Sequence, residues 1–119
     1  MEIQSSNVVF HVSDLEKSIQ FYTEVLGFTK SFEYGSPPSY AGLSLGPVNL
    51  HVSSGYAYKN NTGHGNLYII CDEVGSINQK CLENNVTFFS HIASRDFGMK
   101  DFAIQDPDGN QIGFGANDV

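Results

Sequence analysis

The alternation of hydrophobic and polar residues follows the same plan twice along the chain. Near the N-terminus, NVVFHV alternates as a β-strand does, and the next segment, SDLEKSIQFYTEVLG, changes to a helical period. Ser13 and Glu16 have the spacing of a capping box, which predicts where the helix begins, and Gly27 is the residue expected to end it. The apolar stripe of this helix comprises Leu15, Ile19, Tyr22 and Leu26.

The second half repeats this order. NLYIIC predicts a strand, and Asp72 is expected to cap a helix that runs to about Asn85 with a stripe of Val74, Ile77 and Cys81. Aligning Asn7 with Asn66 superimposes the two strands and places Ser13 on Asp72. Three strand-like runs follow each helix: FTKSFEY, YAGLSLG and VNLHVSS in the first half, and VTFFSHI, KDFAIQ and QIGFG in the second. The chain therefore predicts a βαβββ order that occurs twice.

Turn and loop signals divide the chain further. Pro107 and Gly109 in DPDGN predict a tight turn, so the last two strands form a hairpin. The polar segment SGYAYKNNTGHG joins the two halves and is expected to be a linker or mobile loop. We expect a single domain over residues 1–119, with module one at about 1–54, the linker at about 54–65 and module two at about 65–119.

Composition narrows the class of protein. Hydrophobic residues make up 40% of the chain and charged residues 16%, which is typical of a globular protein. A net charge of −7 with six scattered Lys and Arg argues against nucleic acid as a partner. No apolar run approaches the ~20 residues of a membrane span and no signal peptide is evident, so we expect no membrane partner and a cytoplasmic location. Cys71 and Cys81 lack CxxC spacing and are expected to be buried, reduced thiols.

Two segments resemble a known family. HVSDLEKSIQFYTEVLGF in the first module and AIQDPDGNQIGFG at the end of the second are similar to the vicinal oxygen chelate superfamily, which includes glyoxalase I, extradiol dioxygenases and bleomycin-resistance proteins. The resemblance covers essentially the whole chain. It implies an α+β fold in which two βαβββ modules form an open, cleft-lining β-barrel with helices outside. It also implies that two chains pair as a homodimer.

Strand alternation predicts which side chains face that cleft. Phe10, Val12, Leu50 and Val52 are expected to pack against the helices, as are Ile69, Ile112 and Phe114. The opposite face of the same strands then carries Asn7, Val9, His11, Asn49, His51, Ser53, Asn66, Tyr68, Ile70, Gln111, Gly113 and Gly115.

The resemblance also implies where a metal ion would bind. Metal-dependent members place His or Glu on the first and last strands of each module. Those positions fall here on Asn7, Asn66 and Gly113, with the fourth on Asn49, or on His51 if the register changes by one pair. Neutral amides are poor ligands for a first-row metal, and glycine has no side chain. We therefore expect no metal, no other cofactor and no catalytic residue.

A cleft without a metal resembles that of the bleomycin-resistance branch. The sequence thus predicts a metal-independent, antibiotic-like small-molecule binding protein that acts by sequestration and is not an enzyme. Its ligand is expected to be planar, aromatic and cationic, given the aromatic and amide side chains and the acidic charge. The expected ligand-binding residues are Asn7, His11, Tyr40, Asn49, His51, Tyr56, Tyr58, Asn66, Tyr68 and Gln111.

Two alternatives remain open at this point. A divergent metal-dependent glyoxalase, lyase or dioxygenase would use His11 and His51 around a relocated metal. A regulatory or partner-binding module is also compatible with the sequence, because nothing in it identifies the ligand. The residue types at Asn7, Asn66 and Gly113 favour the binding protein.

Overall fold

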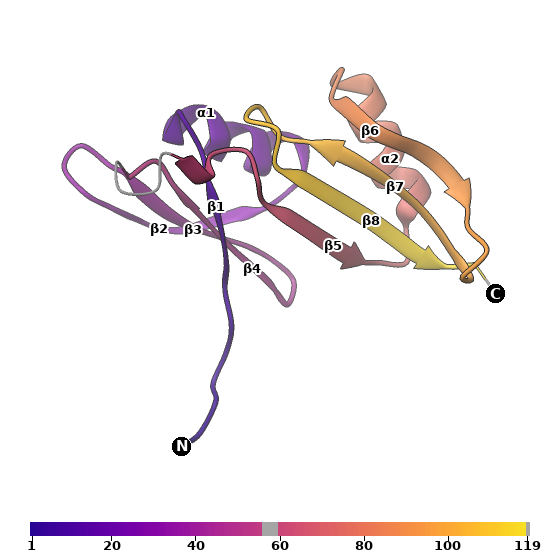
Figure 1. Ribbon diagram of the computed structural model, residues 1–119, viewed down its shortest axis with the longest axis horizontal. Coiled ribbons are helices and arrows are strands. Elements are labelled where there is room, and N and C mark those ends of the chain that lie inside the picture. The colour runs from indigo at the N-terminus through magenta and orange to yellow at the C-terminus, as the bar shows by residue number, and fades with distance from the viewer. Residues whose placement is uncertain (56–59, 119) are drawn as a thin grey trace.

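The computed structural model describes residues 1–55 and 60–118 and contains two four-stranded sheets. The first module comprises β1 (Val8–His11), α1 (Leu15–Gln20), η1 (Phe21–Val25), β2 (Thr29–Tyr34), β3 (Tyr40–Leu45) and β4 (Val48–Ser53). The second comprises β5 (Asn66–Ile70), α2 (Val74–Glu83), β6 (Thr87–Ser94), β7 (Met99–Gln105) and β8 (Gln111–Asn117). The predicted α+β fold of two βαβββ modules is confirmed (Figure 1).

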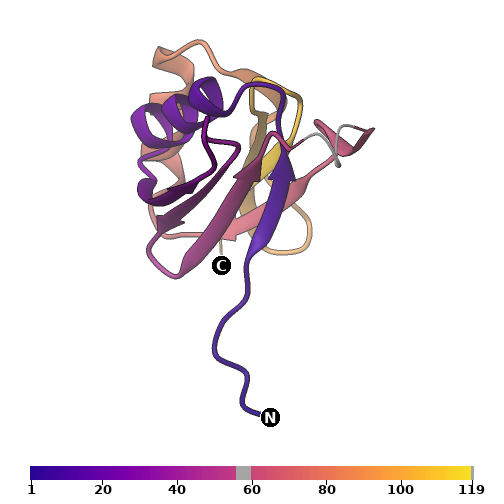
Figure 2. The same ribbon diagram turned by 90° about the vertical axis from the view of Figure 1, so that its left-hand side faces the viewer.

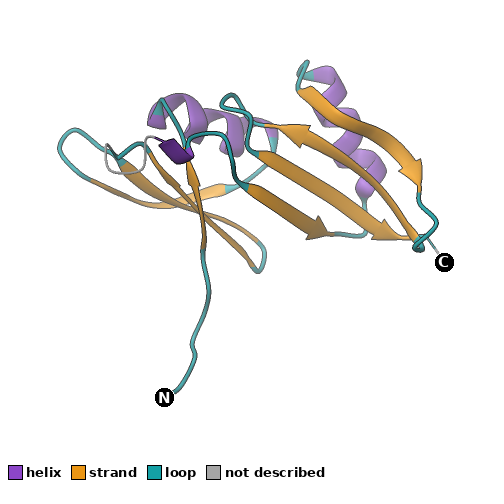
Figure 3. Cartoon of the chain, viewed as in Figure 1, coloured by secondary structure: helices purple, strands orange, loops and turns teal. Residues whose placement is uncertain are grey.

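Both sheets have the same strand order. The first runs β1-β4-β3-β2 and the second β5-β8-β7-β6, with a parallel pair at one edge of each sheet and antiparallel pairs elsewhere. The sheets lie side by side and α1 and α2 cover the same side of them, which leaves the opposite faces open (Figures 2 and 3). The molecule measures 46 × 41 × 24 Å along its principal axes. The described strands form two curved sheets and no closed barrel.

Alternation along the strands produces the core. Phe10, Val12, Leu50 and Val52 are all buried in the first module, and Ile69, Ile112 and Phe114 are buried in the second. These side chains belong to one hydrophobic cluster that includes residues of both modules. None of the helices in the described ranges is long and apolar enough to cross a membrane.

Both predicted helix starts are wrong by one residue. Asp14 caps α1 through a carboxylate oxygen that accepts a hydrogen bond from the Lys17 amide at 3.1 Å, and the Ser13 amide instead donates to the Asp108 carboxylate. In the second module the Cys71 amide still donates to the Gly115 carbonyl along β8, so Glu73 is the N-cap of α2 and Asp72 is not. In both cases the helix begins one residue later than the capping pattern indicates.

The first helix changes from α-helical to π-helical hydrogen bonding between α1 and η1. The Leu26 amide donates to the Phe21 carbonyl five residues back, as in a π-helix. The Thr23 hydroxyl donates to the Ile19 carbonyl at 2.8 Å and so competes for the acceptor that an α-helix would give to the Thr23 amide. Gly27 ends the helix with a φ of 84°, as the sequence predicts.

The turn between β7 and β8 joins the two modules. Asp106 and Asn110 are buried in it, and Asp106 accepts a hydrogen bond of 2.7 Å from the hydroxyl of Tyr22, which is also buried, in the first module. The Asn110 amide group donates to Asp106 at 2.9 Å and to the His11 carbonyl at 3.2 Å. Burial, and next the Asp106 carboxylate, raise the pKa of Tyr22 well above its ordinary value. The predicted tight turn is present, with Gly109 at a φ of 98°.

Replacing Tyr22 with Phe removes this hydrogen bond and leaves the ring in place. A buried bond to a carboxylate contributes more than an ordinary one, so we expect a loss of about 2 kcal/mol in the free energy of unfolding, measured by urea denaturation. Tyr34→Phe is the control because that side chain is 73% exposed. Equal losses in the two variants would contradict the role of Tyr22.

Candidate functional site

The open face of the first sheet carries a cluster of aromatic rings, which we call the aromatic face and define as Phe32, Tyr34, Tyr40 and His51. The strand register places Phe32 opposite Gly42 and Gly42 opposite His51, so all of them lie on one surface. The hydroxyl of Tyr40 and Nδ1 of His51 share a hydrogen bond of 2.8 Å. This bond fixes both rings on the face opposite the helices.

Close ring contacts hold the aromatic face together. The Phe32 ring stacks on Tyr40 with 6.2 Å between centroids, and both rings meet His51 edge-on at 5.3 Å. A Cβ atom at Gly42 would collide with the Phe32 ring, so the absence of a side chain there lets Phe32 reach its neighbours. Phe32 remains 43% exposed, and Tyr34 lies further out along the same strand. The cluster therefore offers an apolar stacking surface to a planar molecule.

The open face of the second sheet is built around Tyr68. Its hydroxyl donates to Asp101 at 2.9 Å, and the Arg95 guanidinium donates to the other carboxylate oxygen at 2.7 Å. Reduced hydration of the hydroxyl and then the hydrogen bond to Asp101 raise the pKa of Tyr68. The Tyr68 ring lies over Gly113 and Gly115, where an added Cβ would collide with it. We call Tyr68, Asp101 and Arg95 the tyrosine network.

A small hollow adjoins the tyrosine network. It has a volume of about 170 Å³, and its lining includes Asn66, Gln111, Phe89 and Ser90. Asn66 and Gln111 are neighbours in the β5–β8 register and supply amide groups on the open face. The second sheet thus combines one half-exposed ring with hydrogen-bonding side chains, whereas the first sheet is mainly aromatic.

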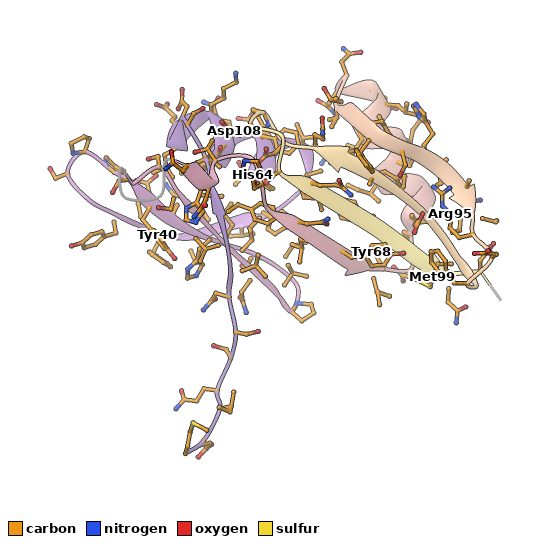
Figure 4. All side chains as sticks on the ribbon, in the orientation of Figure 1. Tyr40, His64, Tyr68, Arg95, Met99 and Asp108 are labelled. Atoms are coloured by element: carbon orange, nitrogen blue, oxygen red, sulfur yellow. The ribbon has the colours of Figure 1, made fainter. Side chains whose placement is uncertain are left out.

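The sequence-predicted ligand residues fall into two groups on different sheets. Tyr40 and His51 lie together on the first sheet, and Asn66, Tyr68 and Gln111 lie together on the second. Figure 4 labels Tyr40 in the first module and Tyr68 in the second. Within one chain the two groups lie on separate sheets placed side by side.

The remaining predicted residues lie around these groups. Asn7 is exposed just before β1, and Asn49 lies opposite Ser44 on β4. His11 ends β1, and its carbonyl accepts hydrogen bonds from Gly63 and Asn110. Tyr56 and Tyr58 lie outside the described residues.

The residues at the expected metal positions do not fit a metal ion. Val9 lies opposite His51 in the first module, and its counterpart Tyr68 lies opposite Gly113 in the second. Gly113 is therefore the position in the second module that corresponds to His51. At Gly113 the Tyr68 ring covers the backbone where a ligand side chain would project. Across the described ranges no group of three or more His, Cys, Asp or Glu side chains is placed to hold a metal. The donors at the expected positions are the amides of Asn7, Asn49 and Asn66 and the His51 imidazole, which shares a hydrogen bond with Tyr40.

Four candidate functional residues were not predicted from the sequence: Phe32, Tyr34, Asp101 and Arg95. Phe32 and Tyr34 alternate with Glu33 in FEY, and Asp101 alternates with the core residue Phe102, so strand parity was the signal that could have found three of them. Arg95 follows the end of β6, where the two register shifts of that strand conceal the parity. Only the folded structure brings its guanidinium to Asp101.

Comparison with known proteins agrees with this architecture. The sequence matches the model of the Glyoxalase/Bleomycin resistance protein/Dioxygenase superfamily over residues 5–114. The chain belongs to that superfamily. No match was found among curated proteins.

Several solved structures have the same fold. TnmS3, an antibiotic binding protein from Streptomyces sp. CB03234, matches with a TM-score of 0.83 and 21% identity, covering 98% of this chain and 97% of TnmS3. TioX from Micromonospora sp. ML1 matches with a TM-score of 0.82 and 14% identity, covering 96% of this chain and 98% of TioX. A superfamily member from Sphaerobacter thermophilus DSM 20745 has a TM-score of 0.80 and 22% identity, with 98% of both chains covered.

Substituting Gly115 with Ala tests the placement of Tyr68. The added methyl group collides with the Tyr68 hydroxyl, so the ring must move and its hydrogen bond to Asp101 is lost. That bond favours the protonated phenol, so the pKa of Tyr68 is expected to fall, measured by NMR titration of the Tyr68 ring carbon. Gly75→Ala, where nothing lies near the added atom, is the control. An unchanged Tyr68 titration in Gly115→Ala would refute the arrangement.

Proposed function

We propose that this protein binds a planar, aromatic, antibiotic-like small molecule without a metal and protects by sequestering it unchanged. The observation that carries this proposal is the Tyr68 ring over Gly113 and Gly115. A half-exposed aromatic surface occupies the place where a metal-dependent relative would project a ligand side chain. The fold similarity to TnmS3, whose description is an antibiotic binding protein, supports the same class of ligand.

The two open faces supply complementary contacts for such a molecule. The aromatic face stacks against an aromatic ring system, which is favourable because ring surfaces are removed from water. Asn66, Gln111 and the His51 imidazole then provide hydrogen bonds that orient the ligand. Asn7, His11 and Asn49 line the approach along β1 and β4 in this proposal.

The acidic character of the chain favours a ligand that carries positive charge. A net charge of −7 creates a negative potential that attracts cations over distances of about the Debye length. Arg95 compensates Asp101, so this attraction comes from the whole surface and not from one carboxylate in the hollow. We therefore propose a cytoplasmic protein whose ligands are cationic aromatic compounds.

A homodimer completes the site in this proposal. The open faces of the two modules lie side by side in one chain, so a ligand on either face is covered from one direction only. Exposed Val9, Phe32, Tyr34, Ile70 and Phe89 on or beside these faces favour coverage by a second chain. Light scattering of the purified protein is expected to give twice the 13.1 kDa mass of the chain. A monomer at micromolar concentration would contradict this part of the proposal.

Binding and turnover are the direct test of function. With bleomycin as the first probe, followed by other cationic aromatic antibiotics, calorimetry is expected to show reversible stoichiometric binding, and mass spectrometry is expected to recover the probe unchanged. His51→Ala and Tyr68→Ala are each expected to weaken binding about tenfold, since base- and ring-stacking contacts contribute roughly 1–3 kcal/mol. Both variants should stay folded because neither residue belongs to the buried core.

Phe97→Ala is the matched control, since this ring is exposed in the turn between β6 and β7 and lies outside both open faces. Conversion of a bound probe to product, or a stoichiometric metal that His51→Ala releases, would overturn sequestration. Either result would favour the metal-dependent enzymes of the superfamily.

A further inference from the structure

A second pocket lies between the two modules and is lined mainly by residues of the helix-covered side of the sheets, together with exposed Ile70 at the end of β5. It has a volume of about 400 Å³ and lies between the β3–β4 hairpin and the C-terminal end of β5. Its position differs from that of the aromatic face and of the tyrosine network, and none of their residues lines it. Each module contributes one wall.

Apolar side chains form most of the pocket. Ile69 and Phe114, neighbours in the β5–β8 register, lie in its buried floor together with Leu26 at the end of η1. The walls include Leu45 and Val48 on the hairpin of the first module and Ile77 on α2. The volume lies within the range of small-molecule sites, which is roughly 300–1,000 Å³. Such a surface binds an apolar group by removing it from water.

The polar groups of the pocket all come from one segment. Cys71, Asp72 and Glu73 follow β5 and form the edge of the pocket, where both carboxylates are exposed. Burial and then the Asp72 carboxylate raise the pKa of the Cys71 thiol, a hydrogen bond to the Glu73 backbone lowers it, and the Glu73 carboxylate raises it to a smaller extent. Both negative charges therefore act at the pocket. Among the described residues that line it, no Lys, Arg or His balances them.

We propose that this pocket binds amphiphilic cations, with an aliphatic chain on the floor of Ile69, Phe114 and Leu26 and an ammonium group beside Asp72 and Glu73. The apolar floor favours ligands with an aliphatic chain, and the two carboxylates favour ligands whose polar end carries a positive charge. The site accepts aliphatic ligands because its floor offers an apolar surface without the exposed stacked rings of the aromatic face.

Octylamine and octanoate test the proposal, because they have the same chain and opposite charges. NMR titration of the full chain is expected to show octylamine binding with a dissociation constant of about 1 mM, as its small size permits. The chemical-shift changes caused by octylamine should occur at residues 45–48 and 69–77. Octanoate is expected to bind about tenfold more weakly, since two exposed carboxylates attract the amine and repel the acid.

Asp72→Asn/Glu73→Gln is expected to abolish the difference in affinity between the two ligands, because octylamine then binds more weakly and octanoate more tightly. Glu2→Gln/Asp96→Asn removes the same total charge at exposed positions outside the pocket and should preserve the difference. Equal binding of amine and acid to the unmodified chain would overturn the proposal. Shifts confined to Tyr40, His51 and Tyr68 would also overturn it, because the amine would then occupy the open faces.

Discussion

The buried hydrogen bonds around Asp106 are the interaction on which the arrangement of the two modules depends. Its carboxylate accepts from Tyr22 in the first module and from Asn110 within its own turn. A buried carboxylate is costly unless its lone pairs are satisfied, so the turn and the first helix must meet in one geometry. That geometry sets the two sheets side by side with their helices on the same side, and both open faces follow from it.

The two modules share a backbone and differ in chemistry. On each open face an aromatic ring covers a glycine of a neighbouring strand: Phe32 covers Gly42, and Tyr68 covers Gly113. The first face surrounds its ring with other aromatics, while the second ties its ring to a carboxylate and a guanidinium. A duplicated fold thereby presents two different surfaces, which suits a molecule with an apolar ring system and a polar edge.

Much of this architecture could be predicted from the sequence because it follows from local periodicity. Alternation in NVVFHV and QIGFG placed Phe10, Val12 and Phe114 in the core, and the turn signals of DPDGN identified the last hairpin. The first residues of the helices were harder to predict from the sequence. Asp14 and Ser13 can both serve as the N-cap of α1, and a contact of the Ser13 amide with distant Asp108 decides between them. Predicting the tyrosine network would have required the register between β6 and β7, which contains two shifts. Local sequence patterns do not encode that register.

The fit of Tyr68 against the glycines of β8 also constrains how this surface can change over evolutionary time. A glutamate introduced at Gly113 alone would collide with the ring, and loss of the ring alone would leave the Asp101 carboxylate with Arg95 as its remaining side-chain partner. Each single step toward a metal-binding face therefore passes through a less stable intermediate. Coupled substitutions therefore separate the present surface from a metal-binding one, so drift by single mutations is expected to preserve the ring-lined face rather than to introduce a metal centre.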